Sequence, residues 1–177
     1  RVTEMKIEIT NAIAEVEQLI LAVWEANEIP CLIGVPGIGK TEAPVTVCNA
    51  DHLPLIWDKA VYNDPGDVRG MPLVWLNKAR AQDETKWATP SQWPRDEGPG
   101  IVLLDEFPHA PQLTQNAYAP LLYDRRIGDY QLPDKWLIIA TGNREGDRAA
   151  THRMPTHIAG RFIHFDVEVN VDEWVEW

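Results

Sequence analysis

Eight consecutive residues, 34–41, have the types and the spacing of a loop that binds phosphate. They read Gly-Val-Pro-Gly-Ile-Gly-Lys-Thr and match the pattern G-x-x-x-x-G-K-S/T throughout. Glycines let such a loop point its N–H groups inward, and a helix N-terminus behind it adds donors and a dipole that favours anions. The alternative is a surface turn rich in Gly and Pro, but the apolar run 30–33 directly ahead of the loop favours a nucleotide site.

Within this loop, the Lys and the Thr carry the most specific chemistry. Lys40 can reach the β- and γ-phosphates of a nucleotide, and the hydroxyl of Thr41 can bind Mg²⁺. We predict that the nucleotide is held by Gly34, Pro36, Gly37, Ile38, Gly39, Lys40, Thr41 and Glu42.

A second stretch, 101–106, ends in two carboxylates. Its four apolar residues predict a buried strand, and Asp105 and Glu106 follow at the carboxyl end. Because ligands of an open parallel sheet bind beyond the carboxyl ends of its strands, we expect both side chains near the nucleotide. Asp105 would hold Mg²⁺ or its waters, and Glu106 would be the general base for the attacking water. An acidic pair is also common as a simple strand end, but its position between the phosphate loop and further strands favours the catalytic interpretation.

The apolar run 136–140 predicts another buried strand, which is followed by Thr-Gly-Asn. If this strand lies beside the one that ends at Glu106, Asn143 could orient the attacking water or contact the γ-phosphate. The alternative is that Asn143 is a turn residue next to Gly142.

Composition limits the remaining possibilities. The 177 residues fit one domain, and 45% apolar with 24% charged residues is typical of a soluble globular protein. No stretch reaches the roughly 18 apolar residues that span a bilayer, and the N-terminal segment lacks a signal-peptide pattern. The two cysteines lack metal spacing, so we expect free thiols in a cytoplasmic protein. The net charge of −11 argues against a broad surface for nucleic acid.

The elements that must position these residues follow from hydrophobic periodicity. Ile13, Val16, Ile20 and Val23 predict a helix over 10–26, packed ahead of the first strand. Residues 63–100 are expected to be the least regular part, with Trp75, Trp87 and Trp93 covering the edge of the core or, alternatively, contacting a partner. Further elements are expected at 53–57 (strand), 111–123 (helix), 124–130 (hairpin or turn) and 162–169 (strand).

Taken together, the motifs GVPGIGKT, IVLLDE, LIIATGN and AGRF resemble the core domain of AAA+ ATPases, over nearly all of residues 28–177. Within this family, the chain is most similar to the MoxR-like, dynein-related branch. The similarity lies in the Thr-Gly-Asn ending, the later Met-Pro and Arg-Phe pairs and a Trp-containing final segment. The resemblance implies an α/β P-loop NTPase fold with a five-stranded parallel sheet, order 5-1-4-3-2, flanked by helices. We expect the whole chain, 1–177, to form this domain, with a nucleotide-binding core at 28–170. The helical lid of the family would follow the last strand and is not expected within this sequence.

The same resemblance assigns roles to individual residues. Lys40 and Thr41 take the first phosphate-site motif, Asp105 and Glu106 the second, and Asn143 the first sensor position. Arg161 matches an arginine before Phe that reaches into the site of a neighbouring subunit, where it would act as an arginine finger; Arg153 is a second candidate. Relatives often carry an acidic residue where this chain has Gly160, which weakens the match at Arg161.

The resemblance also implies a function. AAA+ domains form rings, usually of six subunits, with ATP and Mg²⁺ bound between subunits. MoxR-like relatives remodel or activate a protein partner, often one with a von Willebrand-type domain. The alternatives are a DNA-directed motor or restriction-type component, against which the acidic charge counts, and a nucleotide-sensing module, which needs neither Glu106 nor Asn143. The protein substrate, the ring size and the choice between adenine and guanine stay open.

Overall fold

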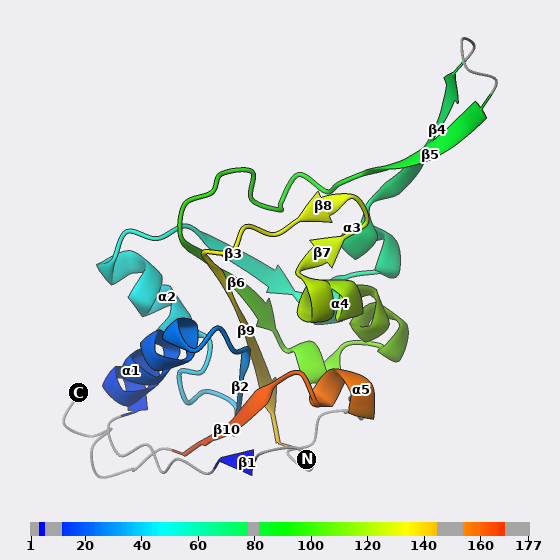
Figure 1. Ribbon diagram of the computed structural model, residues 1–177. Helices are drawn as coiled ribbons and strands as arrows, with labels where there is room; N and C mark the ends of the chain where they lie inside the picture. The colour runs from blue at the N-terminus through cyan, green and yellow to red at the C-terminus, as the bar shows by residue number, and fades with distance from the viewer. Residues whose placement is uncertain (1–3, 6–11, 78–81, 145–153, 169–177) are drawn as a thin grey trace.

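The computed structural model describes residues 4–5, 12–77, 82–144 and 154–168, and its centre is a sheet with helices on both faces (Figure 1). The strand order is β1-β10-β2-β9-β6-β3, and every neighbouring pair runs parallel. The strands are β1 (Glu4–Met5), β2 (Pro30–Gly34), β3 (Leu55–Lys59), β6 (Gly100–Asp105), β9 (Trp136–Asn143) and β10 (Ile163–Val167).

The sheet confirms the predicted α/β class and adds one strand to the predicted five. From β10 to β3 the strands follow the order 5-1-4-3-2. The sixth strand, β1, pairs with β10 at the edge and was not predicted. It is two residues long, too short to contain an apolar run that the sequence could reveal. An edge strand of this length depends on the backbone of its neighbour.

Helices cover the sheet on both sides (Figure 1). One layer contains α1 (Ala12–Glu25) and α2 (Glu42–Ala50), and their apolar side chains pack with one set of strand residues. The other layer contains α4 (Gln112–Asp124) and α5 (Thr156–Ala159), which pack with the alternate set. In β6, for example, Ile101 and Leu103 belong to the first core and Val102 and Leu104 to the second, as expected for a strand buried on both faces.

Most predicted elements lie within a few residues of their predicted positions. The helix predicted over 10–26 is α1, the helix over 111–123 is α4, and the 124–130 segment contains the small hairpin of β7 (Arg126–Ile127) and β8 (Tyr130–Gln131). The second strand begins at Leu55 rather than Leu53, and the last one spans 163–167 rather than 162–169. Pro44 is the third residue of α2, so it falls in the first turn, where a missing N–H costs no helical hydrogen bond.

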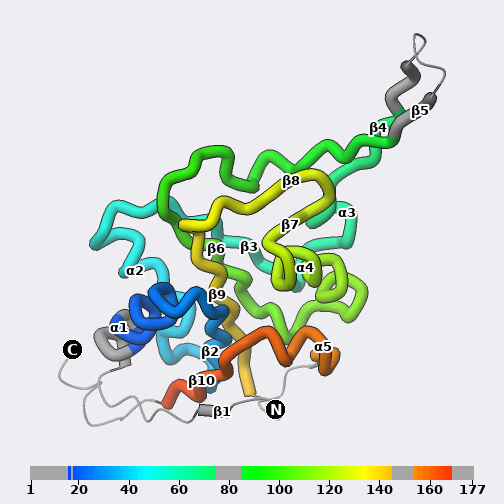
Figure 2. The backbone as a smooth tube through the Cα atoms, viewed as in Figure 1, coloured from blue at the N-terminus to red at the C-terminus, as the bar shows by residue number. Residues whose placement is uncertain are grey.

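The expectation of an irregular region over 63–100 was wrong for 65–69, 71–77 and 82–88, and right for 89–99, which contains no helix or strand. An antiparallel hairpin of β4 (Met71–Asn77) and β5 (Gln82–Ala88) extends away from the body of the molecule (Figures 1 and 2). It follows the short helices η1 (Ala60–Tyr62) and α3 (Pro65–Arg69). The strands pair with each other and not with the main sheet, and the side chains described in them, at 71–74 and 85–88, are exposed. At the base of the hairpin, Gly70 has a φ of 83°, and a Cβ there would lie 2.0 Å from the carbonyl oxygen of Ala88.

The tryptophans of this region divide between core and surface. Trp93 is 1% exposed, stacks on Tyr130 and donates its indole N–H to the carbonyl of Val68, as predicted for a residue that covers the core. Trp87, in the hairpin, is 37% exposed. The side chain of Trp75 lies outside the described residues. In the described part of the chain, no helix combines the length and the apolar character needed to cross a membrane.

Candidate nucleotide-binding site

The phosphate-type loop connects β2 to α2, as its sequence predicts. Gly34 is the last residue of β2, and Gly37 and Gly39 have φ values of 84° and 85°, a left-handed conformation that favours glycine. These two residues curl the chain so that it enters α2 at Glu42, whose side chain is exposed in the first turn. The first N–H groups of a helix have no partner within the helix, so this end of α2 presents donors beside the loop.

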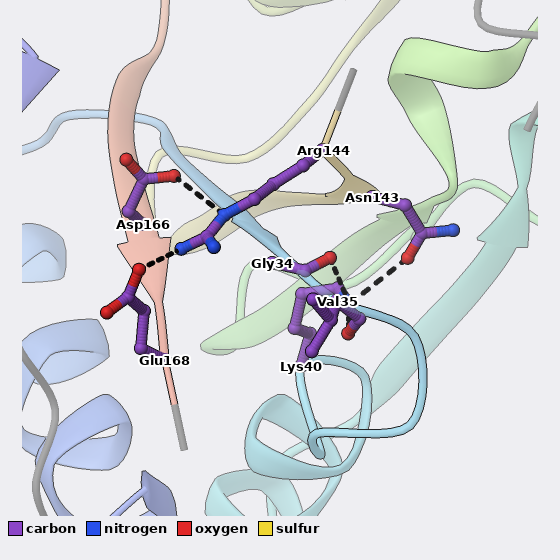
Figure 3. A network of polar contacts seen from close by, with 7 residues as sticks. All are labelled: Gly34, Val35, Lys40, Asn143, Arg144, Asp166 and Glu168. Carbon is purple, nitrogen blue, oxygen red and sulfur yellow. Dashed lines mark hydrogen bonds and ion pairs between the residues drawn. The ribbon is translucent and has the colours of Figure 1, made fainter. Parts of the chain in front are cut away.

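Lys40 lies at the centre of the site and is 7% exposed (Figure 3). Its Nζ donates to the carbonyl oxygens of Gly34 and Val35, at 3.0 and 2.6 Å, and to the Oδ1 of Asn143 at 3.2 Å. The ammonium is therefore held between the loop and the end of β9. Pro36 is exposed, and Ile38 is half-buried against the core beneath the loop.

Asp105, the last residue of β6, is buried and accepts three side-chain hydrogen bonds. Its Oδ1 accepts from the hydroxyl of Thr41 at 3.0 Å and from that of Thr141 at 2.6 Å. Its Oδ2 accepts from the indole N–H of Trp57 at 3.0 Å. Thr41 and Asp105, each predicted separately as a Mg²⁺ ligand, are thus in contact, and the other two donors come from β9 and β3.

Glu106 follows β6 directly and has an unusual backbone. Its φ of 54° is left-handed, which is uncommon for a residue with a side chain, and its backbone N–H donates to the hydroxyl of Thr141 at 3.3 Å. The turn redirects the chain into the short helix η2 (Phe107–His109) and leaves the side chain of Glu106 exposed at the edge of the sheet. Strained backbone of this kind is found preferentially at functional sites.

Asn143 and Arg144 stand at the end of β9. Arg144 forms ion pairs with Asp166 at 3.7 Å and with Glu168 at 2.5 Å, both on or just after β10 (Figure 3). Because β2 lies between β9 and β10, these ion pairs connect the strands on either side of the phosphate loop. They fix the backbone next to Asn143, whose Oδ1 already accepts from Lys40.

His109 was not singled out by the sequence analysis. Both of its ring nitrogens are buried, and within the described residues neither has a hydrogen-bond partner. Burial lowers the pKa of His109; the Glu106 carboxylate opposes this shift, while the Lys40 cation adds to it. An imidazole whose protonated form is disfavoured by burial therefore lies near Glu106 and Lys40. No spacing pattern marks it, because its place follows from the turn at Glu106.

Thr141 and Trp57 were also not predicted as site residues. The Thr of the Thr-Gly-Asn ending supplies a hydrogen bond to Asp105, which its proximity in sequence to Asn143 could have suggested. Trp57 lies on β3, and only the pairing of β3 with β6 brings it to the site.

Arg161 lies near the amino ends of the strands, whereas the phosphate loop lies at their carboxyl ends. Arg161 precedes β10, whose first residue, Ile163, bonds through its backbone to Ile29 at the start of β2. The exposed guanidinium stacks on the ring of Tyr123, with Cζ 3.8 Å from the centroid. Five residues of parallel strand span roughly 16 Å, so Arg161 is well separated from the phosphate loop of its own chain. Arg153 lies outside the described residues.

The site has the chemistry that Mg²⁺ with a nucleotide requires. Thr41 and Asp105 offer hard oxygen ligands side by side, 3.0 Å apart. Among the described residues no group of three or more His, Cys, Asp or Glu side chains is placed to hold a metal. A site with few protein ligands suits Mg²⁺, which is usually bound through one or two protein groups together with phosphate oxygens and waters.

Comparison with models of known protein families found no match, and comparison with curated proteins found none. Solved structures do match. A protein from Cytophaga hutchinsonii described as a candidate ATPase aligns over 95% of this chain and 50% of its own, with 20% identity and a TM-score of 0.58. NtrX from Brucella abortus in complex with ATP aligns over 93% of this chain and 37% of its own, with 16% identity and a TM-score of 0.58. A second structure of NtrX gives 92%, 38%, 17% and 0.55 for the same quantities.

At these identities the likeness shows the fold alone, and this fold agrees with the α/β class predicted from the sequence. It does not distinguish the MoxR-like branch from others. The chain spans half or less of the length of each of these structures.

Proposed function

We propose that this chain is a AAA+ module that hydrolyses ATP with Mg²⁺. The observation that carries the proposal is that three separate segments meet at the carboxyl ends of the central strands. The ammonium of Lys40 meets the amide of Asn143, and the hydroxyl of Thr41 meets the carboxylate of Asp105. An ammonium, a Thr–Asp pair and a helix N-terminus together form a site for a nucleoside triphosphate.

Each side chain has a distinct task in hydrolysis. Lys40 binds the β- and γ-phosphate oxygens, and the N–H groups of the loop and of α2 bind the phosphates alongside it. Thr41 and Asp105 would hold Mg²⁺, which when bound supplies positive charge against the phosphate oxygens. Glu106 accepts a proton from the attacking water, and Asn143 positions that water beside the γ-phosphate.

Arg161 completes the site of a second copy of the chain rather than its own. Its place at the edge where the strands begin supports this role, because the phosphate loop lies where they end. Tyr123 holds the guanidinium, and the Tyr123 hydroxyl donates to the carbonyl of His157 at 2.7 Å. An arginine supplied by a neighbour stabilises charge in the transition state only within an assembly. We therefore propose a ring, with six subunits as the family's usual number.

The wider role of the module rests on the resemblance of its motifs to the MoxR-like branch. In that role, the chain acts in the cytoplasm and uses ATP hydrolysis to remodel or activate a protein partner, such as one with a von Willebrand-type domain. The net charge of −11 favours a protein over a nucleic acid as the substrate.

ATP turnover per chain, measured over a range of protein concentrations, tests this function. The specific rate should rise with concentration, because sites are completed between subunits. Excess Arg161→Ala protein should then suppress the wild-type rate, whereas Arg126→Ala, a change at another exposed arginine, should not. A rate per chain that stays flat, with Arg161→Ala as active as the wild type, would rule out completion of the site by a neighbour.

A further inference from the structure

Trp57 lies at the surface, but its indole nitrogen, the one polar atom of its side chain, forms a hydrogen bond within the site. Its side chain is 49% exposed, yet the indole N–H donates to the Oδ2 of Asp105 at 3.0 Å. The register of β3 and β6 explains how it reaches. Lys59 pairs with Asp105, and Trp57 lies two residues earlier on the same face, so its ring extends along β3 toward the end of β6.

The Asp105 carboxylate is held from both neighbouring strands. Thr141 on β9 donates to Oδ1, and Trp57 on β3 donates to Oδ2. Thr41, the predicted Mg²⁺ ligand on the phosphate loop, also donates its hydroxyl hydrogen to Oδ1. Donors on both oxygens fix the rotation of the carboxylate, so that Oδ1 faces Thr41 and Oδ2 faces Trp57.

Packing alone does not explain a tryptophan at this position. Trp57 is half-exposed, and it borders an open depression whose other lining residues are Asp58, Lys59, Tyr62 and Asn63. The ammonium of Lys59 lies 5.5 Å from the centroid of the ring, which adds a cation–π contact but no burial. What the position specifically supplies is a neutral donor that reaches a buried carboxylate.

We propose that Trp57 is a positioning residue for the Mg²⁺ site, acting through Asp105. The N–H of Trp57 holds Oδ2, so that Oδ1 remains beside the Thr41 hydroxyl where the cation would bind. The inference rests on the proposed function, since it concerns the same site. Hydrogen-bonding partners behind metal ligands typically change metal affinity by about 10- to 100-fold when removed.

The test compares nucleotide binding with and without Mg²⁺ by calorimetry, using a non-hydrolysable ATP analogue. The variants are Trp57→Phe, which removes the N–H, and Trp57→Gln, which restores a donor at the same number of bonds from Cα. Trp87→Phe is the matched control, because Trp87 is also partly exposed but lies in the β4–β5 hairpin. Thermal unfolding of each variant establishes that it is folded.

We expect Trp57→Phe to keep the Mg²⁺-free affinity of the wild type and to lose about tenfold of the tightening that Mg²⁺ produces. Trp57→Gln should recover part of it, and Trp87→Phe should behave as the wild type. Equal Mg²⁺ tightening in Trp57→Phe and the wild type would overturn the inference and leave the proposed function standing. If the wild type itself bound no nucleotide with Mg²⁺, both would be overturned.

A spectroscopic measurement tests the contact directly. With eight tryptophans in the chain, the indole N–H signals can be resolved by NMR, and the one missing in Trp57→Phe identifies Trp57. That signal should shift most when Mg²⁺ is added to the nucleotide complex, because its acceptor then shares charge with the cation. An unmoved Trp57 signal, with other signals shifting, would contradict the proposed role.

Discussion

The Nζ of Lys40 lies 3.2 Å from the Oδ1 of Asn143, a residue 103 positions later in the chain. The sheet explains the contact. β2 and β9 are neighbours, and Gly34, where the phosphate loop begins, stands opposite Asn143 in their register. Two motifs that are remote in sequence therefore lie together at the carboxyl ends of neighbouring strands. A γ-phosphate bound by Lys40 would be within reach of the Asn143 amide.

Lys40→Ala should weaken ATP binding by about 100-fold or more, because the phosphates lose the buried ammonium that pairs with them. Calorimetric or fluorescent nucleotide titration measures the change. Lys86→Ala, which removes an exposed lysine from β5, is the matched control and should bind as the wild type. Wild-type affinity in Lys40→Ala would mean that the nucleotide is bound elsewhere.

Asn143→Ala should reduce ATP hydrolysis by about 100-fold, as expected when one positioning group is removed from a site that develops charge. Nucleotide binding should change far less, because Lys40 and the loop remain. Asn49→Ala, at an exposed position of α2, serves as the control. A large loss of binding with an unchanged rate per bound nucleotide would instead indicate that the amide mainly holds Lys40.

Stability should fall as the pH drops below about 6.5, the ordinary pKa of histidine, in part because of His109. Burial lowers the pKa of His109 in the folded chain, so over this range the unfolded chain binds a proton that the folded chain does not. The free energy of unfolding therefore decreases as the pH falls from about 6.5 toward the lowered pKa. Urea unfolding at several pH values from neutral to mildly acidic measures the slope.

His109→Gln removes the titrating group and should flatten that slope relative to the wild type. The matched control is His52→Gln, because His52 is exposed in the turn after α2. Identical slopes in the wild type and His109→Gln would show that His109 does not contribute.

Much of the fold can be predicted from the sequence, because buried parallel strands consist of runs of apolar residues. The apolar runs at 30–33 and 101–104 predicted the two strands, and the motifs that follow them predicted that Thr41 and Asp105 lie at the carboxyl ends of these strands, where they form a hydrogen bond. The helix over 10–26 follows in the same way from its periodicity.

What the sequence did not predict depends on contacts between distant segments. The hairpin of β4 and β5 falls in the region 63–100, which was expected to be the least regular part of the chain. Trp57 looked like an ordinary end of a strand, and His109 had no motif around it. Their relation to the site required the register of β3 on β6 and the left-handed turn at Glu106.

The most direct test of the account is steady-state ATP hydrolysis by the wild type and by Glu106→Gln, with nucleotide binding measured on the same samples. The account predicts Mg²⁺-dependent turnover by the wild type, and a loss of about 100- to 10,000-fold in Glu106→Gln, since that variant lacks the base that activates water. Binding should be retained in both. Turnover by Glu106→Gln at the wild-type rate, or bound nucleotide that the wild-type assembly never hydrolyses, would contradict it.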